Sequence, residues 1–291
     1  MNDLLDIALE QHIIDQANSQ IASHVNSPHV DKPDASLVAC ATVWVALNFM
    51  LIACMDERND GSLQFGIDAR TVSGFQPISS RSYLGDELQA RFLAPQRIGN
   101  PAPLVVFLHG SGQRGYDTIQ QLQTLPQQLF RTGSVSCAIL APQCPPQTWW
   151  DSWIPELEEL IEQTIRQHRI APNRVYLTGL SMGGYGSWEL AARRPDLFAA
   201  VLPICGGGHP EWAERLKQTA IWAIHGAEDS VVPPERSREM ITAIQSAGGN
   251  PHYTELPGVG HDSWHDAYDP ASGILKWMFE QRRSAPALKQ E

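Results

Sequence analysis

Residues 174–184, RVYLTGLSMGG, decide the fold of this 291-residue chain. An apolar run ends at Thr178 and is followed by a glycine, a leucine, Ser181 and, after one more residue, a second glycine. The pattern indicates a buried strand, a tight turn with a serine at its tip, and the start of a helix. Glycines are needed on both sides because a side chain two residues from the serine would collide with neighbouring backbone. We therefore predict that Ser181 is a nucleophile.

The sequence around this segment alternates short apolar runs with segments of helical character. The other apolar runs are continuous rather than alternating in polarity, and they cover residues 104–108, 138–141, 199–205 and 221–225. Strands buried on both faces have this pattern, which favours a mostly parallel sheet with helices on both sides. The expected helices cover 119–131, 154–169, 183–194 and 234–247. The fold class is α/β, and two alternating runs, at 63–72 and 88–93, predict antiparallel edge strands.

A second glycine-rich turn, Leu108–Gly112 (LHGSG), follows an earlier buried strand. Acyl transfer develops negative charge on the substrate oxygen, so a serine nucleophile needs fixed N–H donors beside it. We expect these oxyanion donors to be the backbone N–H groups of Met182, directly after the serine, and of Ser111. His109 is a possible general base, but a structural role in this turn is the favoured interpretation.

Two later turns contain the residues needed to activate a serine. Asp229 follows the strand at 221–225, and His261 lies in the segment Gly258–Asp262. The histidine would accept the serine proton, and the aspartate would fix its tautomer and stabilise the imidazolium. Competitors for the two roles are His252 and His265 for the base and Glu228 for the acid.

From about Ala90 to Phe279, the chain resembles the bacterial serine esterases and peptidases related to prolyl oligopeptidase, dienelactone hydrolase and phospholipase/carboxylesterases. Six segments carry the resemblance in one order: LHGSGQRG, LAPQCP, VYLTGLSMGGYGSWELA, LFAAVLPICGGG, HGAEDSVVP and PGVGHDSW. The resemblance implies an α/β-hydrolase fold without a large cap domain, and a Ser181, Asp229 and His261 triad. Dienelactone hydrolase itself uses a cysteine, so that activity is not implied.

Composition excludes several other functions. The chain carries 32 acidic and 21 basic residues, for a formal net charge of −11, which argues against a nucleic-acid partner. Five cysteines without ligand-like spacing argue against a zinc site or a disulfide scaffold. Cys137 and Cys144 could form a disulfide in an oxidising compartment, but two small half-buried side chains are the favoured interpretation. We expect no metal and no cofactor.

The N-terminal 60 residues differ from the catalytic domain expected at 61–291. They contain the uncharged run 37–55, whose 19 residues match the thickness of a hydrocarbon core. The end of the run, with Cys54, resembles a lipobox, although the leader is long and lacks a basic region directly before the run. We expect either a removed signal segment or membrane attachment through 37–55 or a lipidated Cys54, and hence a bacterial cell-envelope or periplasmic location. The alternative is a buried core helix in a cytoplasmic protein.

The expected reaction is hydrolysis of carboxylic esters with short or moderate acyl groups. The interval 206–220 is too short for a cap, which favours an open cleft and small or polymer-attached esters as substrates. A serine peptidase or amidase is the alternative activity, and a non-catalytic binding protein is a third hypothesis.

Four residues are candidates for substrate binding. Trp149, Trp150 and Trp153 follow the strand at 138–141 and form either an aromatic wall or part of the core. Arg114 is a candidate partner for a substrate carboxylate, with an ion pair that braces its own loop as the favoured alternative.

Overall fold

The structure is a computed structural model that describes residues 67, 69–81, 87–95, 101–132 and 137–283. Contacts within the chain separate residues 1–62 from residues 63–291, and all described residues belong to the second unit. The predictions for the run 37–55 and for Cys54 lie outside the described residues.

One mixed sheet of eight strands forms the centre of the described unit, in the order β1-β2-β4-β3-β5-β6-β7-β8. The strands are β1 (Gln76–Arg81), β2 (Glu87–Leu93), β3 (Ala102–Leu108), β4 (Ala138–Pro142), β5 (Ile170–Leu180), β6 (Ala200–Ile204), β7 (Trp222–Gly226) and β8 (His252–Leu256). β1 pairs antiparallel with β2, β2 pairs antiparallel with β4, and all other pairings are parallel. The α/β class and the mostly parallel sheet are therefore confirmed.

The prediction of an edge strand at 63–72 is wrong for its described part. Residues Ala69–Gly74 form helix α3, and the edge strand is β1, which follows it. The alternation of apolar and polar residues continues to Arg70, so the pattern alone does not show that the chain is helical from Ala69 onward. The second antiparallel prediction, at 88–93, is confirmed by β2.

Central strand β3 shows how the sheet divides the core into two layers. All seven of its residues are buried. Leu104, Val106 and Leu108 contribute to one apolar cluster, whereas Val105 and Phe107 contribute to the other. Because successive side chains of a strand point to opposite faces, both faces of β3 must be covered by helices.

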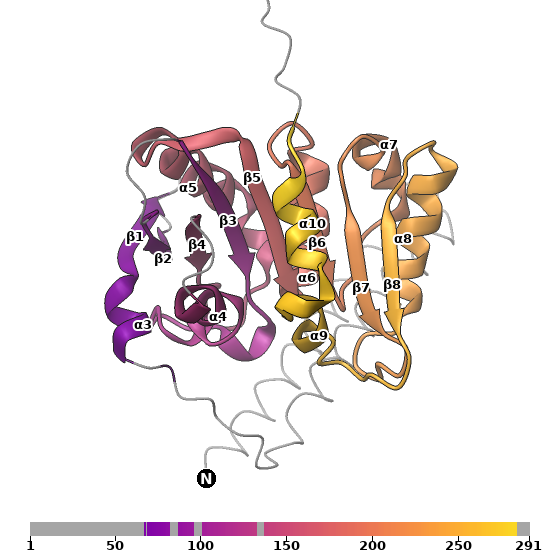
Figure 1. The fold of residues 1–291 in the computed structure, drawn as a ribbon, viewed down its shortest axis with the longest axis horizontal. Helices are drawn as coiled ribbons and strands as arrows, with labels where there is room; N and C mark the ends of the chain where they lie inside the picture. The colour runs from indigo at the N-terminus through magenta and orange to yellow at the C-terminus, as the bar shows by residue number, and fades with distance from the viewer. Residues whose placement is uncertain (1–66, 68, 82–86, 96–100, 133–136, 284–291) are drawn as a thin grey trace, which may run out of the picture. The chain divides into compact units, whose positions relative to one another are not determined.

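The helices cover these two faces. Those contributing to the first cluster are α5 (Ile154–Gln167), α6 (Met182–Arg193), α7 (Ala213–Leu216) and α8 (Glu235–Ser246). Those contributing to the second are α4 (Leu125–Thr132), α9 (Trp264–Tyr268) and α10 (Ile274–Glu280). Figure 1 shows α4 and α10 in front of the sheet and α6 behind it. Short 3-10 turns link the elements at Ser111–Gln113, Gln120–Leu122, Trp150–Trp153, Pro210–Trp212 and Pro270–Ser272.

The segment 206–220 between β6 and β7 contains only a 3-10 turn and the four-residue helix α7. The absence of a large cap at this position is therefore confirmed for the described residues. Helix α8 begins after Pro234 and ends before Gly248, which has a φ of 87°. A glycine in the left-handed conformation therefore follows the end of the helix.

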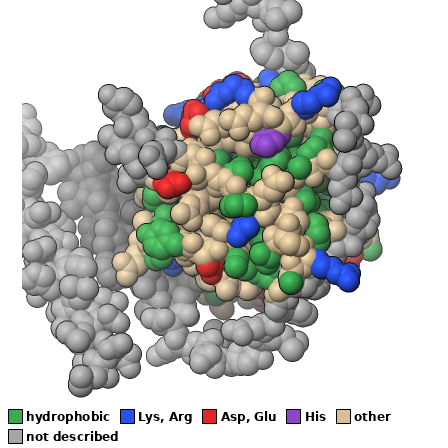
Figure 2. All heavy atoms as spheres, turned by 90° about the vertical axis from the view of Figure 1, so that its left-hand side faces the viewer, with side chains coloured by type: hydrophobic (Ala, Val, Ile, Leu, Met, Phe, Trp, Pro, Cys, Tyr) green, Lys and Arg blue, Asp and Glu red, His purple; other side chains and the backbone are tan. Residues whose placement is uncertain are grey.

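The surface has no concentrated basic region on the face that Figure 2 presents, where acidic and basic side chains are scattered among apolar and polar ones. Among the described residues, Tyr116 is the one large hydrophobic side chain that is mostly exposed. Within the same part of the chain, no helix is both long enough and apolar enough to span a bilayer.

Candidate active site

The turn between β5 and α6 places Ser181 where the sequence predicted. Ser181 has φ 53° and ψ −116°, a conformation that is strained for any residue with a side chain. A Cβ atom on Gly183 would lie 1.9 Å from the carbonyl oxygen of Leu108, and one on Gly179 would lie 2.3 Å from that of Gly183. Both positions therefore require glycine for close packing of backbone against backbone.

The neighbouring strand anchors the turn. The backbone N–H of Ser181 donates to the carbonyl oxygen of Ile204 at 2.9 Å, and its nitrogen also lies 3.3 Å from the Sγ atom of Cys205. In the first turn of α6, the N–H of Tyr185 donates to the carbonyl of Ser181 at 3.1 Å. These bonds hold the nucleophile in its strained conformation without help from a ligand.

His261 and Asp229 complete the triad with Ser181. The Nε2 atom of His261 lies 3.0 Å from the Oγ of Ser181, and its Nδ1 atom lies 2.8 Å from Oδ2 of Asp229. The three side chains come from the turns after β5, β7 and β8. Since these strands are parallel, their carboxyl ends meet at one edge of the sheet, the edge at which α/β proteins bind ligands.

The carboxylate of Asp229 is buried and receives several hydrogen bonds. Its Oδ1 accepts the N–H groups of Val231 and Val232, both at 2.9 Å. Oδ2 faces His261 and a second histidine, His225, whose Nε2 lies 3.2 Å away. Burial acts to raise the pKa of Asp229, but the hydrogen bonds from His225 and His261 outweigh it and hold the pKa well below its ordinary range. The triad acid is therefore an anion at neutral pH.

Sequence reasoning missed His225, the last residue of the apolar run at 221–225. Its side chain is completely buried. A signal was present, because a histidine within an otherwise apolar strand, four residues before the predicted acid, needs a polar partner.

The predicted oxyanion loop lies beside the nucleophile. A Cβ atom on Gly110 would come within 3.7 Å of the Cβ of Ser181. Ser111 directly follows Gly110 and begins a 3-10 turn. Met182 is the first residue of α6, where backbone N–H groups have no partner within the helix and the helix dipole is positive. The two expected donors are thus on opposite sides of Ser181 in the chain and adjacent to it in space.

His109 has a structural role, as the favoured interpretation predicted. Its Nε2 atom accepts the N–H of Cys144 at 2.9 Å, so Nδ1 carries the proton and donates to the carbonyl of Gly110 at 2.6 Å. Burial lowers the pKa of His109 to about 4, which keeps the ring neutral. The histidine connects the ends of β3 and β4 and shapes the oxyanion loop.

The three tryptophans after β4 do not share one environment. Trp150 is 1% exposed and donates its indole N–H to the carbonyl of His109 at 3.0 Å, so it belongs to the core and cannot serve as a wall for substrate. Trp149 and Trp153 are half-buried, and Trp153 donates to the hydroxyl of Thr148 at 2.9 Å. These two remain candidates for substrate contact.

Arg114 braces its own loop through carbonyl groups rather than through an ion pair. Its guanidinium donates to the carbonyls of Ser111 at 3.0 Å and Thr148 at 3.4 Å, and it lies 5.8 Å from the ring centroid of Trp149. Because these bonds occupy the side chain, loop bracing explains its position without a substrate carboxylate.

The alternative acids and bases lie elsewhere. His252 packs against the rings of Trp222 and Trp277, which also contact each other. His265 and Glu228 are exposed, and no hydrogen bond of their side chains to the triad is present among the described residues. The geometry therefore favours His261 and Asp229 over these alternative residues.

Within the described residues, three side chains that can ligate a metal meet at one point, namely Cys205, Asp229 and His261. Burial raises the pKa of the Cys205 thiol far above its ordinary value, so it stays protonated and is a poor ligand. The other two already bond to each other within the triad. Cys137 and Cys144 are buried free thiols, so they do not form a disulfide with each other.

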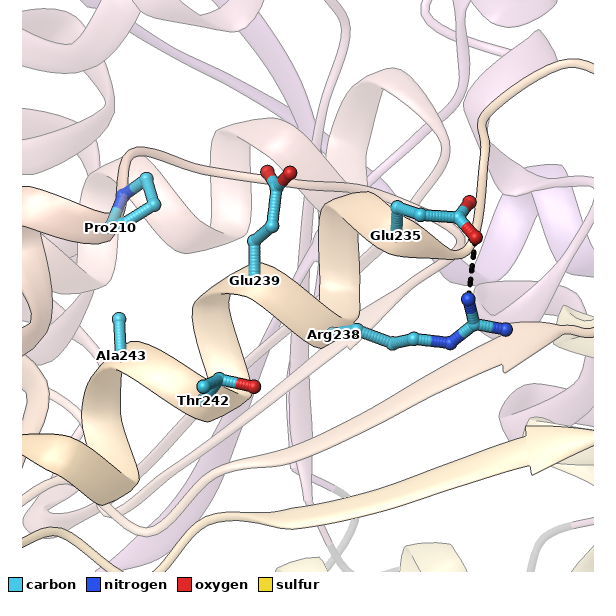
Figure 3. Close-up of a pocket in the computed structure, with 6 residues that line it drawn as sticks. All are labelled: Pro210, Glu235, Arg238, Glu239, Thr242 and Ala243. Carbon is cyan, nitrogen blue, oxygen red and sulfur yellow. Dashed lines mark hydrogen bonds and ion pairs between the residues drawn. The ribbon is translucent and has the colours of Figure 1, made fainter.

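A shallow hollow on the outer side of α8 contains no member of the triad (Figure 3). Its lining residues are Pro210, Glu235, Arg238, Glu239, Thr242 and Ala243. Arg238 is paired with Glu235 and with Glu255 on β8, so the one cation of the hollow is already neutralised.

Comparisons with known proteins find esterases among the similar sequences and structures. A model of the phospholipase/carboxylesterase family matches residues 147–277. A solved thermostable esterase shares 34% sequence identity and a TM-score of 0.68, over 73% of this chain and 64% of its own. The chain has the α/β-hydrolase fold and is similar in sequence to esterases of that fold. A putatively assigned dienelactone hydrolase from Klebsiella pneumoniae, at 18% identity and a TM-score of 0.57, shares the fold alone.

Two curated relatives of this α/β-hydrolase are also named for ester cleavage. Poly(3-hydroxyalkanoate) depolymerase C of Paucimonas lemoignei is 41% identical over 165 residues, which is 46% of this chain and 37% of that protein. An esterase of Mycobacterium tuberculosis is 30% identical over 209 residues, which is 68% of this chain and 64% of that protein. The α/β-hydrolase chain thus spans less than two thirds of the length of each of these relatives.

Proposed function

We propose that this protein hydrolyses carboxylic esters through a covalent acyl-enzyme intermediate. The proposal rests on two consecutive hydrogen bonds. One joins Oγ of Ser181 to Nε2 of His261 at 3.0 Å, and the other joins Nδ1 of His261 to Oδ2 of Asp229 at 2.8 Å. A serine becomes an effective nucleophile when a positioned base removes its proton during attack.

In the acylation step, Oγ of Ser181 attacks the carbonyl carbon of the ester while its proton passes to Nε2 of His261. The Nδ1–H of the resulting imidazolium donates to the anionic carboxylate of Asp229, which stabilises the positive charge. The backbone N–H groups of Ser111 and Met182 would bind the oxyanion of the tetrahedral intermediate. When the intermediate collapses, the bond to the alcohol oxygen breaks, and the leaving alcohol takes the proton from Nε2.

Water then completes the cycle. His261 removes a proton from a water molecule, and the water oxygen attacks the acyl carbon bound to Ser181. Collapse of this second intermediate releases the carboxylic acid and returns the proton to Oγ. In each step the proton is held on Nε2 of His261. This histidine therefore acts as a base and then as an acid in acylation, and does so again in deacylation.

The proposed substrates are small or polymer-attached esters of short or moderate acyl groups. The short segment between β6 and β7 leaves the triad without a large cap on that side, and an open cleft suits such substrates. The relative named as a polyester depolymerase supports a polymer-attached ester. Trp149 and Trp153 are our candidates for contact with the acyl or alcohol group.

The test is hydrolysis of p-nitrophenyl acetate, butyrate and octanoate by the protein and by its Ser181→Ala variant. Removal of a triad nucleophile is expected to lower kcat by about 10⁴ to 10⁶. The trend with chain length then gives the size of the acyl pocket. Equal, slow rates in both proteins would contradict the proposal, and faster cleavage of peptide amides than of esters would favour the peptidase alternative.

A second measurement separates catalysis from mere binding. A fluorescent alkyl phosphonate should label the protein at Ser181, and prior addition of an ester substrate should slow the labelling. Ser181→Ala should remain unlabelled while keeping the same thermal unfolding profile. Absence of labelling in the unaltered protein would favour a non-catalytic binding role.

A further inference from the structure

We propose that His225 is a positioning residue for the triad acid, holding Asp229 so that its Oδ2 atom faces His261. This inference rests on the proposed ester hydrolysis. His225 lies near the end of β7, is completely buried, and touches none of the reacting atoms. Its effect on the reaction would pass through the carboxylate of Asp229.

The proton on Nε2 of His225 follows from its surroundings. This nitrogen lies 2.9 Å from the carbonyl oxygen of Val232 and 3.2 Å from Oδ2 of Asp229. A carbonyl and an ionised carboxylate can only accept hydrogen bonds, so the nitrogen between them must carry a proton. This N–H donates to the carbonyl of Val232, and Oδ2 of Asp229, the same oxygen that serves His261, lies close enough to be its second acceptor.

The other ring nitrogen is fixed by α8. Nδ1 of His225 lies 2.8 Å from Oγ of Ser237, and the same Oγ lies 3.0 Å from the carbonyl oxygen of Gly206. The single hydroxyl proton of Ser237 goes either to Gly206, with Nδ1 as a second N–H donor, or to Nδ1 itself. In both arrangements Nε2 keeps its proton, so the donor toward Asp229 does not depend on the charge of the ring.

These contacts close a circuit that begins and ends at the nucleophile. Ser181 bonds to His261, His261 to Asp229, and Asp229 to His225. His225 contacts Ser237, and Ser237 contacts the carbonyl of Gly206. The residue before Gly206 is Cys205, and its Sγ contacts the N–H of Ser181. The acid loop and the nucleophile turn are thus connected by a second set of contacts that does not pass through His261.

Removal of the His225 donor would leave Oδ2 of Asp229 with a single partner. The carboxylate is buried, and a buried charge that loses a hydrogen bond shifts to recover one. The backbone N–H groups on Oδ1 hold only one of the two oxygens. Rotation about the side-chain bonds would then move Oδ2 relative to His261, and the orientation of the base would suffer.

Two amide variants separate the two nitrogens of the ring. The amide nitrogen of glutamine reaches the position of Nε2, so His225→Gln keeps a donor toward Asp229 and Val232. The amide nitrogen of asparagine reaches only the position of Nδ1, so His225→Asn keeps the contact with Ser237 and loses the one with Asp229. Both variants are uncharged amides in the same buried position, which makes each the control for the other.

The experiment measures kcat and KM for p-nitrophenyl butyrate together with thermal unfolding. We expect His225→Asn to lower kcat by about 10- to 100-fold, the effect of one lost hydrogen bond to a buried charged group, with KM unchanged. His225→Gln should restore kcat to within about threefold of the unaltered protein, since its donor is retained. In an Asp229→Ala background, His225→Asn should have no further effect on kcat, because its partner is already gone.

A spectroscopic measurement tests the same point without turnover. The Nδ1–H proton of His261, shared with Asp229, should give a downfield NMR signal that weakens or moves in His225→Asn and persists in His225→Gln. Equal kcat values and equal spectra in the two variants would overturn the proposal, as would parallel losses of kcat and stability in both. If the unaltered protein shows no Ser181-dependent hydrolysis, the proposed function fails instead, and the NMR signal still decides the role of His225.

Discussion

The ring of His109 joins β3 to β4 by accepting the backbone N–H of Cys144 at 2.9 Å. It does so in its neutral form, since a protonated ring would present a second N–H to the N–H of Cys144. The indole of Trp150 covers the ring edge-on at 5.0 Å between centroids, which excludes water from one side. The shape of the oxyanion loop therefore depends on a histidine that must stay uncharged.

This requirement predicts a pH-dependent stability. Burial lowers the pKa of His109 from 6.5 to about 4. As the pH falls below 6.5 the unfolded chain binds the proton first, so stability is fully present above that pH and is lost down to the folded pKa. The loss amounts to about 3 kcal/mol. Urea unfolding between pH 7 and 4 should show this decline, and His109→Gln should be less stable at pH 7 but should lack this component of the slope. A parallel slope in both proteins would contradict the prediction.

The close packing at the nucleophile turn predicts an intolerant position. Gly183→Ala would place a methyl group 1.9 Å from the carbonyl oxygen of Leu108, so the helix would have to move away from the strand. We expect destabilisation of more than about 3 kcal/mol or failure to fold. Gly112→Ala is the matched control, because nothing lies within 4 Å of a Cβ there. Equal unfolding midpoints for the two variants would show that the crowding is readily relieved.

The oxyanion assignment of Ser111 can be tested at the backbone. Ser111 is the first residue of a 3-10 turn, and Gly110 before it is extended, with φ −77° and ψ 169°. Proline fits such a position and has no N–H. We expect Ser111→Pro to lower kcat by about 10² to 10³ with little change in KM. Ser111→Ala keeps the N–H and should stay close to the unaltered protein, and similar kcat values for both would remove Ser111 from the oxyanion hole.

The apolar run 37–55 predicts that the whole chain associates with membranes. If this run or a lipidated Cys54 meets a membrane, the full chain should sediment with membranes and enter solution only with detergent. A chain that begins at Asn59 should stay in the supernatant. Labelled fatty acid should be incorporated into the full chain but not into a Cys54→Ser variant if the cysteine is lipidated. Full chain that remains in the supernatant would contradict membrane attachment.

The parts of the fold that sequence predicted well are those with a single strong constraint. The buried strand and glycine-flanked turn around Ser181 were placed correctly because only one backbone conformation satisfies that pattern. Predicted helices began and ended within a few residues of α5, α6 and α8. The helix expected at 119–131 instead begins with a 3-10 turn at Gln120–Leu122.

The parts that sequence did not predict depend on contacts between distant segments. β8 was not identified because none of its residues is fully buried and its alternation is weak. Trp150 could not be distinguished from Trp149 and Trp153 by pattern, since its burial follows from packing against His109. The second contact of Asp229 was missed for the same reason, because the chain separation of His225 and the acid says nothing about the direction of the ring.

The strained turn has a consequence for how this scaffold can change over time. The positive φ at position 181 is imposed by the flanking glycines and by the bond to Ile204, and none of these contacts involves the hydroxyl of the serine. The location of the side chain is therefore independent of its chemical identity. A thiol or another small nucleophile could take this place by one substitution and arrive already oriented, whereas the surrounding frame tolerates almost no change.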